Sequence, residues 1–115
     1  MTNQEAFDIM VTHLRKQGCK SEDEQHQHCL YRGPNGLKCA VGALIPDEEY
    51  KPKWDEKGTA AVRLDCAALR GIEGGFLYAM QRAHDHSPVR SWEEKFQEIA
   101  DTYHLTIPPL EAPHA

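Results

Sequence analysis

The sequence predicts an α+β fold, a mainly helical single domain in which about four helices pack around one β-hairpin. Apolar residues recur at helical spacing after capping residues near both ends of the chain, and an Asn-Gly pair joins two short apolar segments between them. With 115 residues, of which 40% are hydrophobic, the chain suits one modest core. We expect residues 1–107 to form this domain and residues 108–115, which open with two prolines, to form a flexible tail.

Two helices are expected from capping residues at their start. Thr2 and Glu5 have the spacing of a capping box, in which each side chain bonds the backbone N–H of the other, and Gly18 ends the helix that follows. Ser91 and Glu94 repeat this spacing before the last helix. The apolar face of that last helix consists of Trp92, Phe96, Ile99, Ala100 and Tyr103. We therefore expect one helix at each end of the domain.

The β-hairpin is predicted between residues 29 and 40. Its strands are residues 29–32 and 37–40, and its turn contains Asn35 and Gly36. Asn-Gly favours a tight hairpin because both residues accept a positive φ. Residues 41–45 are small and apolar, and they are expected to follow as a short buried helix or turn.

The middle of the chain is predicted to hold a loop and two more helices. Residues 51–58 form the loop, in which Trp54 is expected to plug the core because exposing so large an apolar ring is costly. Thr59 is expected to cap a helix that ends at Arg70. The apolar face of this helix carries Val62, Cys66 and Leu69. A third helix follows the glycines, with Phe76, Leu77, Met80, Ala83 and His84 at helical intervals.

The composition narrows the class of partner. Asp and Glu number 18 against 13 Lys and Arg, so the formal charge is -5 and no broad basic field favours nonspecific binding to nucleic acid. No apolar run approaches the ~18 to 20 residues that span a bilayer. The chain also begins with polar residues instead of an export leader. We expect a cytoplasmic protein that has no membrane partner.

A metal site is an alternative that the histidines suggest. In an extended segment His26 and His28 share a face, so they could bind zinc with Cys29, or with Cys19 or Cys39. The spacing of these residues matches no known zinc motif, and ligand types without ligand spacing are weak evidence. We therefore predict no cofactor and keep zinc as the alternative.

Three segments of the sequence carry a resemblance: CLYRGPNGLKCAVGALIPDEEY at residues 29–50, LYAMQRAHD at 77–85 and SWEE at 91–94. In these segments the sequence resembles a family of small uncharacterised proteins encoded by bacteriophages, prophages and bacteria. It implies a phage or mobile-element context and no particular reaction. Small accessory proteins of this kind often bind a host protein or sequester a host signal, which makes a host protein or a host defence component the expected partner.

A thiol hydrolase is one alternative to partner binding. Cys39 precedes an apolar, helix-like segment, and a histidine held by an aspartate, as in His84-Asp85, would complete a Cys-His-Asp nucleophile. The simpler interpretation is that Cys39 and His84 are core residues, because Cys39 lies among small apolar residues and His84 on a core-facing helical position. An enzyme is therefore the less favoured prediction.

A pocket for an anionic ligand such as a nucleotide is the other alternative. Arginine offers a planar fork to phosphate, and aromatic rings stack on bases. The residues that could line such a pocket are Tyr31, Arg32, Lys38, Trp54, Gln81 and Arg82. The simpler interpretation is that Arg32 and Lys38 pair with acidic residues at positions 47–49 on the surface, where such pairs contribute little.

The leading hypothesis is a nonenzymatic accessory protein that binds a host protein through the hairpin and the 51–58 loop. The residues expected to contact the partner or ligand are Tyr31, Arg32, Lys38, Asp47, Tyr50, Trp54 and Gln81. The sequence also permits a homo-oligomer, in which a second copy would complete a site.

Overall fold

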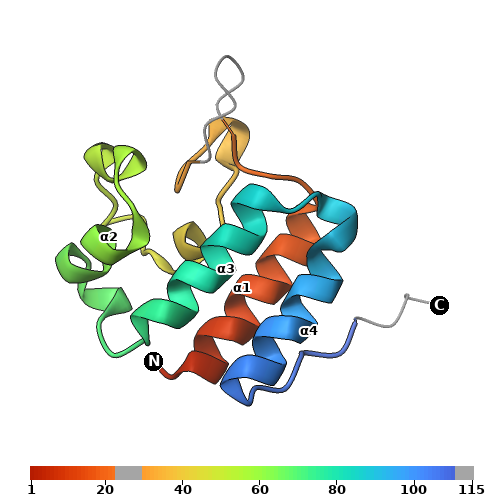
Figure 1. Cartoon of the computed structure of the whole chain (residues 1–115). Coiled ribbons are helices and arrows are strands. Elements are labelled where there is room, and N and C mark those ends of the chain that lie inside the picture. The colour runs from red at the N-terminus through yellow and green to blue at the C-terminus, as the bar shows by residue number, and fades with distance from the viewer. Residues whose placement is uncertain (23–29, 111–115) are drawn as a thin grey trace.

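The computed structural model describes residues 1–22 and 30–110 of the chain. Three long helices run through them: α1 (Asn3–Gln17), α3 (Gly74–His86) and α4 (Trp92–Tyr103), of which α3 and α4 pack against each other (Figure 1). The short α2 (Thr59–Asp65) packs against α3 on the side away from α4. Five 3₁₀ helices connect them: Pro34–Gly36, Val41–Leu44, Pro52–Glu56, Ala67–Leu69 and Val89–Ser91.

The capping signals of α1 are confirmed. The Thr2 hydroxyl accepts from the Glu5 backbone N–H at 3.1 Å, and the Glu5 carboxylate accepts from the Thr2 N–H at 3.0 Å. Gly18 closes the helix with a left-handed φ of 68°. The last helix is confirmed as well, with its apolar face buried, but the Ser91 side chain makes no capping hydrogen bond.

The predicted β-hairpin is wrong, because the described residues contain no strand and no hairpin. The turn chemistry was right: Asn35 and Gly36 have positive φ values of 58° and 79°. The flanking backbone bonds side chains from elsewhere in the chain, which leaves no ladder to form. The Tyr31 N–H donates to Asp55 at 2.7 Å, and the Lys38 N–H donates to the Gln17 side chain at 2.9 Å. The fold is therefore mainly helical instead of α+β.

The predicted helix at 59–70 is shorter than expected. Thr59 is its first residue, not its cap, and Gly58 precedes it without a side-chain capping bond. The backbone leaves helical geometry at Cys66, where φ is −103° and ψ is 116°, and a 3₁₀ helix follows. Val62, Cys66 and Leu69 are nevertheless all buried, as their spacing predicted.

The core lies between the three long helices and the 3₁₀ segments. Phe7 of α1 and Phe76 of α3 meet edge to face with ring centroids 6.1 Å apart. Trp54 is 1% exposed, so the expected plug over the core is confirmed. The predicted short buried element after residue 40 is also confirmed, since Val41, Gly42 and Leu44 are buried in a 3₁₀ helix.

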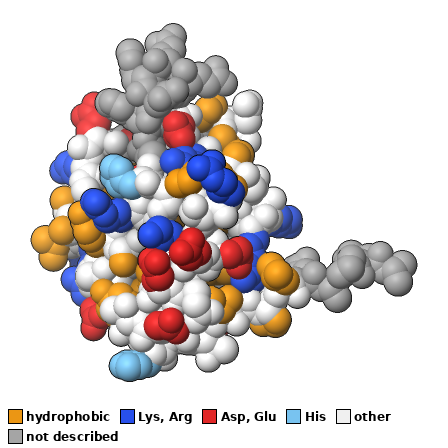
Figure 2. Space-filling model, turned by 45° about the vertical axis from the view of Figure 1, so that its right-hand side comes forward, with side chains coloured by type: hydrophobic (Ala, Val, Ile, Leu, Met, Phe, Trp, Pro, Cys, Tyr) orange, Lys and Arg blue, Asp and Glu red, His pale blue; other side chains and the backbone are white. Residues whose placement is uncertain are grey.

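The chain beyond α4 is fastened to α1. The Gln4 side chain accepts from the Thr106 N–H and donates to the Thr106 carbonyl, and Arg15 donates to the Pro108 carbonyl at 2.7 Å. Charges of both signs are mixed on the surface: on the face in Figure 2, acidic side chains gather near the middle and basic side chains are spread around them. Within the described ranges, none of the helices has the length and apolar character needed to cross a membrane.

Candidate functional site

A small cavity opens between α3 and the segment that leads into α2. Its volume is about 140 Å³, below the roughly 300–1,000 Å³ of pockets that hold drug-sized ligands, so a whole nucleotide does not fit inside it. The residues that line it are Tyr31, Cys39, Asp55, Lys57, Gly58, Thr59, Tyr78, Gln81, Arg82, Asp85 and His86. The cavity therefore contains part of both alternative sites from the sequence: Cys39 and Asp85 of one, and Tyr31, Gln81 and Arg82 of the other.

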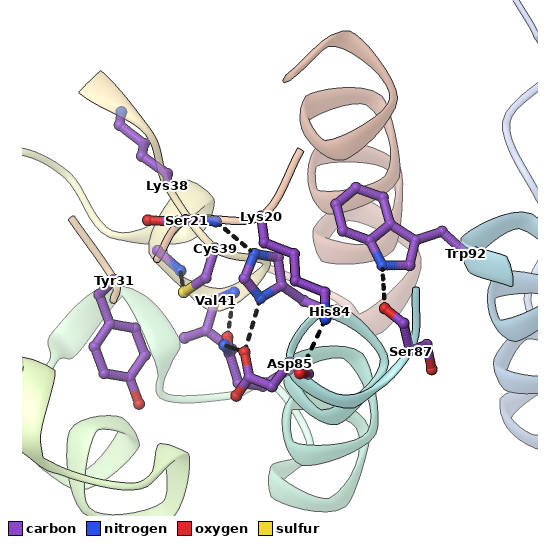
Figure 3. A network of polar contacts seen from close by, with 12 residues as sticks. Lys20, Ser21, Tyr31, Lys38, Cys39, Val41, His84, Asp85, Ser87 and Trp92 are labelled. Atoms are coloured by element: carbon purple, nitrogen blue, oxygen red, sulfur yellow. Dashed lines mark hydrogen bonds and ion pairs between the residues drawn. The ribbon is translucent and has the colours of Figure 1, made fainter. Parts of the chain in front are cut away.

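A chain of polar contacts underlies the floor of this cavity (Figure 3). The Gln81 amide donates to Asp85 Oδ1 at 2.7 Å, and the Gln81 carbonyl oxygen accepts from the Val41 N–H at 3.1 Å. His84 Nδ1 lies 2.7 Å from the same Asp85 oxygen. The contacts join α3 to the 3₁₀ helix that begins at Val41, so they hold two elements of the fold together.

The tautomer of His84 follows from its two partners. The Ser21 backbone N–H donates to His84 Nε2 at 3.0 Å, so Nε2 is an acceptor and the ring proton lies on Nδ1, which donates to Asp85. His84 is fully buried, and both of its ring nitrogens are engaged. A general base for a thiol needs a ring nitrogen aimed at the sulfur.

Cys39 is buried at the floor of the cavity. Its Sγ accepts from the Gly42 N–H at 3.3 Å. Cys39 and Asp85, two predicted members of the thiol site, line the same cavity. The ring nitrogens of His84, the third member, bond Ser21 and Asp85. The arrangement supports a structural role for His84, because both of its ring nitrogens bond other groups of the described residues.

Tyr31 and Asp55 line one part of the cavity wall. The Tyr31 hydroxyl donates to the Lys57 carbonyl at 2.9 Å, and Asp55 accepts from the Tyr31 N–H and from the Tyr50 hydroxyl. Burial raises the pKa of Tyr31 above its ordinary value, and the nearby Cys39 thiol and the carboxylates add to this. Burial and the bond to Asp55 raise the pKa of Tyr50 to about 12. Both phenols therefore stay neutral at physiological pH.

Arg32 lies away from the cavity and clamps the backbone. Its guanidinium donates to the carbonyls of Tyr31, Gly42 and Ile45, and it pairs with Asp47 at 3.0 Å. It also lies over the ring of Tyr50, 5.1 Å from the centroid. Lys38 Nζ lies 3.7 Å from the same Asp47 carboxylate. The simpler interpretation is confirmed, since Arg32 and Lys38 pair with Asp47, and the contact of these residues with a partner or ligand stays a prediction.

Replacing Arg32 with alanine is expected to lower the free energy of unfolding by about 2 kcal/mol, because several carbonyls lose a charged donor at once. Urea denaturation followed by circular dichroism measures this loss. Arg90→Ala, which removes an exposed arginine with no hydrogen bond to the described residues, is the matched control and is expected to change stability little. Equal effects of the two variants would contradict the clamp.

The rim of the cavity is basic, and an apolar hollow adjoins it. Lys57, Arg82 and His86 are exposed residues that line the cavity. The hollow between α2 and α3 measures about 430 Å³ and is lined by Gly58, Thr59, Ala60, Arg63, Leu64, Gly74 and Tyr78. Leu64 is 72% exposed and Tyr78 is 56% exposed, the two large apolar side chains of this surface.

Leu64 and Tyr78 were not among the residues that the sequence suggested. Leu64 does carry a signal, because it falls outside the apolar face formed by Val62, Cys66 and Leu69. An apolar residue on the polar side of an amphipathic helix indicates a candidate interaction surface. Tyr78 carries the same signal, because it falls outside the apolar face that Phe76, Leu77 and Met80 form.

The zinc alternative falls largely outside the described part of the chain. His26, His28 and Cys29 belong to residues 23–29, which the structure does not describe. Within residues 1–22 and 30–110 there is no group of three or more His, Cys, Asp or Glu side chains that could hold a metal ion. Comparisons of the chain with protein-family models, curated proteins and solved structures find no match.

Proposed function

We propose that the chain is a small phage or mobile-element accessory protein that binds a host protein and has no enzymatic activity. The binding surface is the α2–α3 face, defined by Lys57, Ala60, Leu64, Tyr78 and Arg82. One observation carries the proposal: Leu64 and Tyr78 are exposed at the border of an apolar hollow between the two helices. This surface replaces the hairpin as the contact region, while the end of the 51–58 loop remains part of it.

The physical argument starts from the cost of exposing apolar side chains together. A single exposed leucine is ordinary in a folded protein, but two large apolar side chains around a hollow form a patch that gains from being covered. Tyrosine is enriched at the energetic centres of interfaces, since a rigid ring buries a large area for little conformational entropy. Basic side chains at the edge, among them Arg63 and Arg82, supply the polar rim of such a surface.

Two further points support a binding protein over an enzyme. The side chains with catalytic potential, His84 and Asp85, take part in hydrogen bonds that join α3 to other elements. The resemblance of residues 29–50 to phage and prophage proteins favours a role directed at a host component. These polar side chains therefore stabilise the fold, whereas the exposed apolar side chains lie on the α2–α3 face.

The test is capture of partners from a bacterial lysate with wild-type protein and two matched variants, followed by affinity measurement with the purified partner. Leu64→Asp is expected to weaken binding more than about tenfold, because it places a charge at the centre of the interface. Leu110→Asp is the control, since Leu110 is 70% exposed, much like Leu64 at 72%, but lies on the C-terminal segment. Absence of any captured partner, or equal loss in both variants, overturns the proposal.

A further inference from the structure

We propose that the cavity beside α3 is a carboxylate-binding site that accepts a glutamate or aspartate side chain of the protein partner. This inference rests on the proposed function and names the chemistry by which the partner is recognised. The occupant is an acidic side chain that is close, in the partner, to an apolar residue able to cover the hollow between α2 and α3.

The rim of the cavity supplies cationic donors. Lys57 and Arg82 line it, and neither takes part in an ion pair with the described residues, whereas Arg15, Arg32 and Lys51 do. Arg82 donates only a long bond of 3.5 Å to the Tyr78 hydroxyl, so its planar fork faces solvent. In a chain of net charge -5, these cations favour an anion at this place.

The Thr59 hydroxyl adds a donor within the cavity wall. Thr59 lines the cavity, and its residue as a whole is 7% exposed. A threonine hydroxyl can donate one hydrogen bond, so in a cavity wall it suits a ligand that accepts one. The Thr59 hydroxyl and the Arg82 fork together provide the neutral and charged donors that a carboxylate uses.

The acidic residues of the cavity explain where the anion lies. Asp55 accepts from two backbone N–H groups and the Tyr50 hydroxyl, and Asp85 accepts from His84 and Gln81. Both carboxylates have donors bound to them, but their charge still repels an anion from the floor. The bound carboxylate therefore lies at the rim, close to Lys57 and Arg82.

Size and position select a side chain. A cavity of about 140 Å³ resembles the roughly 150 Å³ that holds a benzene molecule, which is enough for a carboxylate on a short stem. The cavity and the apolar hollow share Gly58, Thr59 and Tyr78 in their walls. One partner segment can therefore place the carboxylate of an acidic side chain at the rim of the cavity and an apolar side chain over Leu64.

The first arm of the test uses propionate, which reproduces a glutamate side chain from Cβ to the carboxylate. Titration followed by amide NMR is expected to give saturable shifts at Lys57, Gly58, Thr59 and Arg82. Propionamide, which has the same shape without the charge, is expected to give none. The double variant Lys57→Gln/Arg82→Gln removes two exposed charges, and it is expected to weaken propionate binding by more than about tenfold. Absence of saturable shifts, or equal shifts with propionamide, overturns the inference.

The second arm measures partner affinity with the same double variant. A loss of more than about tenfold, alongside the loss of propionate binding, supports an acidic side chain of the partner as the occupant. If the wild-type protein binds propionate but the double variant keeps its affinity for the partner, the site takes a free carboxylate and the partner assignment is wrong. Failure of the proposed function is recognised separately, because Leu64→Asp then leaves capture unchanged whatever propionate does.

Discussion

Replacing Trp54 with alanine is expected to lower the free energy of unfolding by about 3–5 kcal/mol, the largest effect among the substitutions considered. Trp54 is 1% exposed, and its ring meets Tyr50 edge to face with centroids 6.5 Å apart. Its indole N–H donates to Asp65 at 2.7 Å. Truncation removes the buried ring, leaves a cavity and deprives that carboxylate of a donor. Urea denaturation monitored by circular dichroism measures the change.

Two controls separate the ring from its hydrogen bond. Lys53→Ala alters an exposed neighbour in the same 3₁₀ helix and is expected to change stability little. Trp54→Phe keeps a buried ring but loses the indole donor. The indole N–H and the Lys51 ammonium hold the pKa of Asp65 below its ordinary value, so in Trp54→Phe the Asp65 pKa is expected to rise toward it. A loss below about 1 kcal/mol in Trp54→Ala would show that this ring is not part of the core.

The helices of this fold could be predicted from the sequence because their signals are local. The capping box at Thr2 and Glu5 and the repeat of apolar residues in α4 both lie within a few helical turns, and both were found where expected. Where the local signal is weaker, the observed helix boundary differs from the predicted one. The helix beginning at Thr59 ends early because the backbone at Cys66 turns extended, which residue spacing alone does not reveal.

The hairpin prediction is wrong because the side chains that bond its backbone N–H groups are distant in the sequence. Asn35 and Gly36 adopt the positive φ values that the turn requires, so the local inference was sound. The N–H groups of Tyr31 and Lys38 are nevertheless bonded by Asp55 and Gln17, which come from other parts of the chain. A turn signal predicts a turn, and only the partners of the flanking backbone decide whether strands form.

The candidate site shows the same division between local and distant information. The sequence singled out Cys39, His84 and Asp85 by chemistry, and the fold gathers them near one cavity. It did not show that Ser21, far along the chain, occupies the second nitrogen of His84. Leu64 lies outside the apolar face of its helix, which is a local signal, but whether another element covers it is a tertiary property that the sequence does not show.

Replacing Gly42 with alanine is expected to lower the free energy of unfolding by about 3 kcal/mol, at the upper end of the usual cost of overpacking. A Cβ at this position would run into the carbonyl oxygen of Tyr31, and it would lie 3.0 Å from the Tyr31 carbonyl carbon. Backbone atoms cannot rotate away as a side chain does. The Gly42 carbonyl also accepts from Arg32, and the Gly42 N–H donates to Cys39 Sγ. A shift of the backbone at Gly42 or at Tyr31 therefore breaks these hydrogen bonds.

Gly58→Ala is the matched control for this substitution. Gly58 has a φ of −72°, which any residue adopts, and a Cβ there would meet nothing within 4 Å. Its replacement is expected to leave stability unchanged or raise it by about 0.4–1 kcal/mol through a less flexible unfolded chain. Thermal and urea denaturation of both variants measure the difference. A rigid contact between Gly42 and Tyr31 must lower the stability of Gly42→Ala and leave that of Gly58→Ala intact. Comparable stability of the two variants would therefore show that this close approach does not constrain the fold.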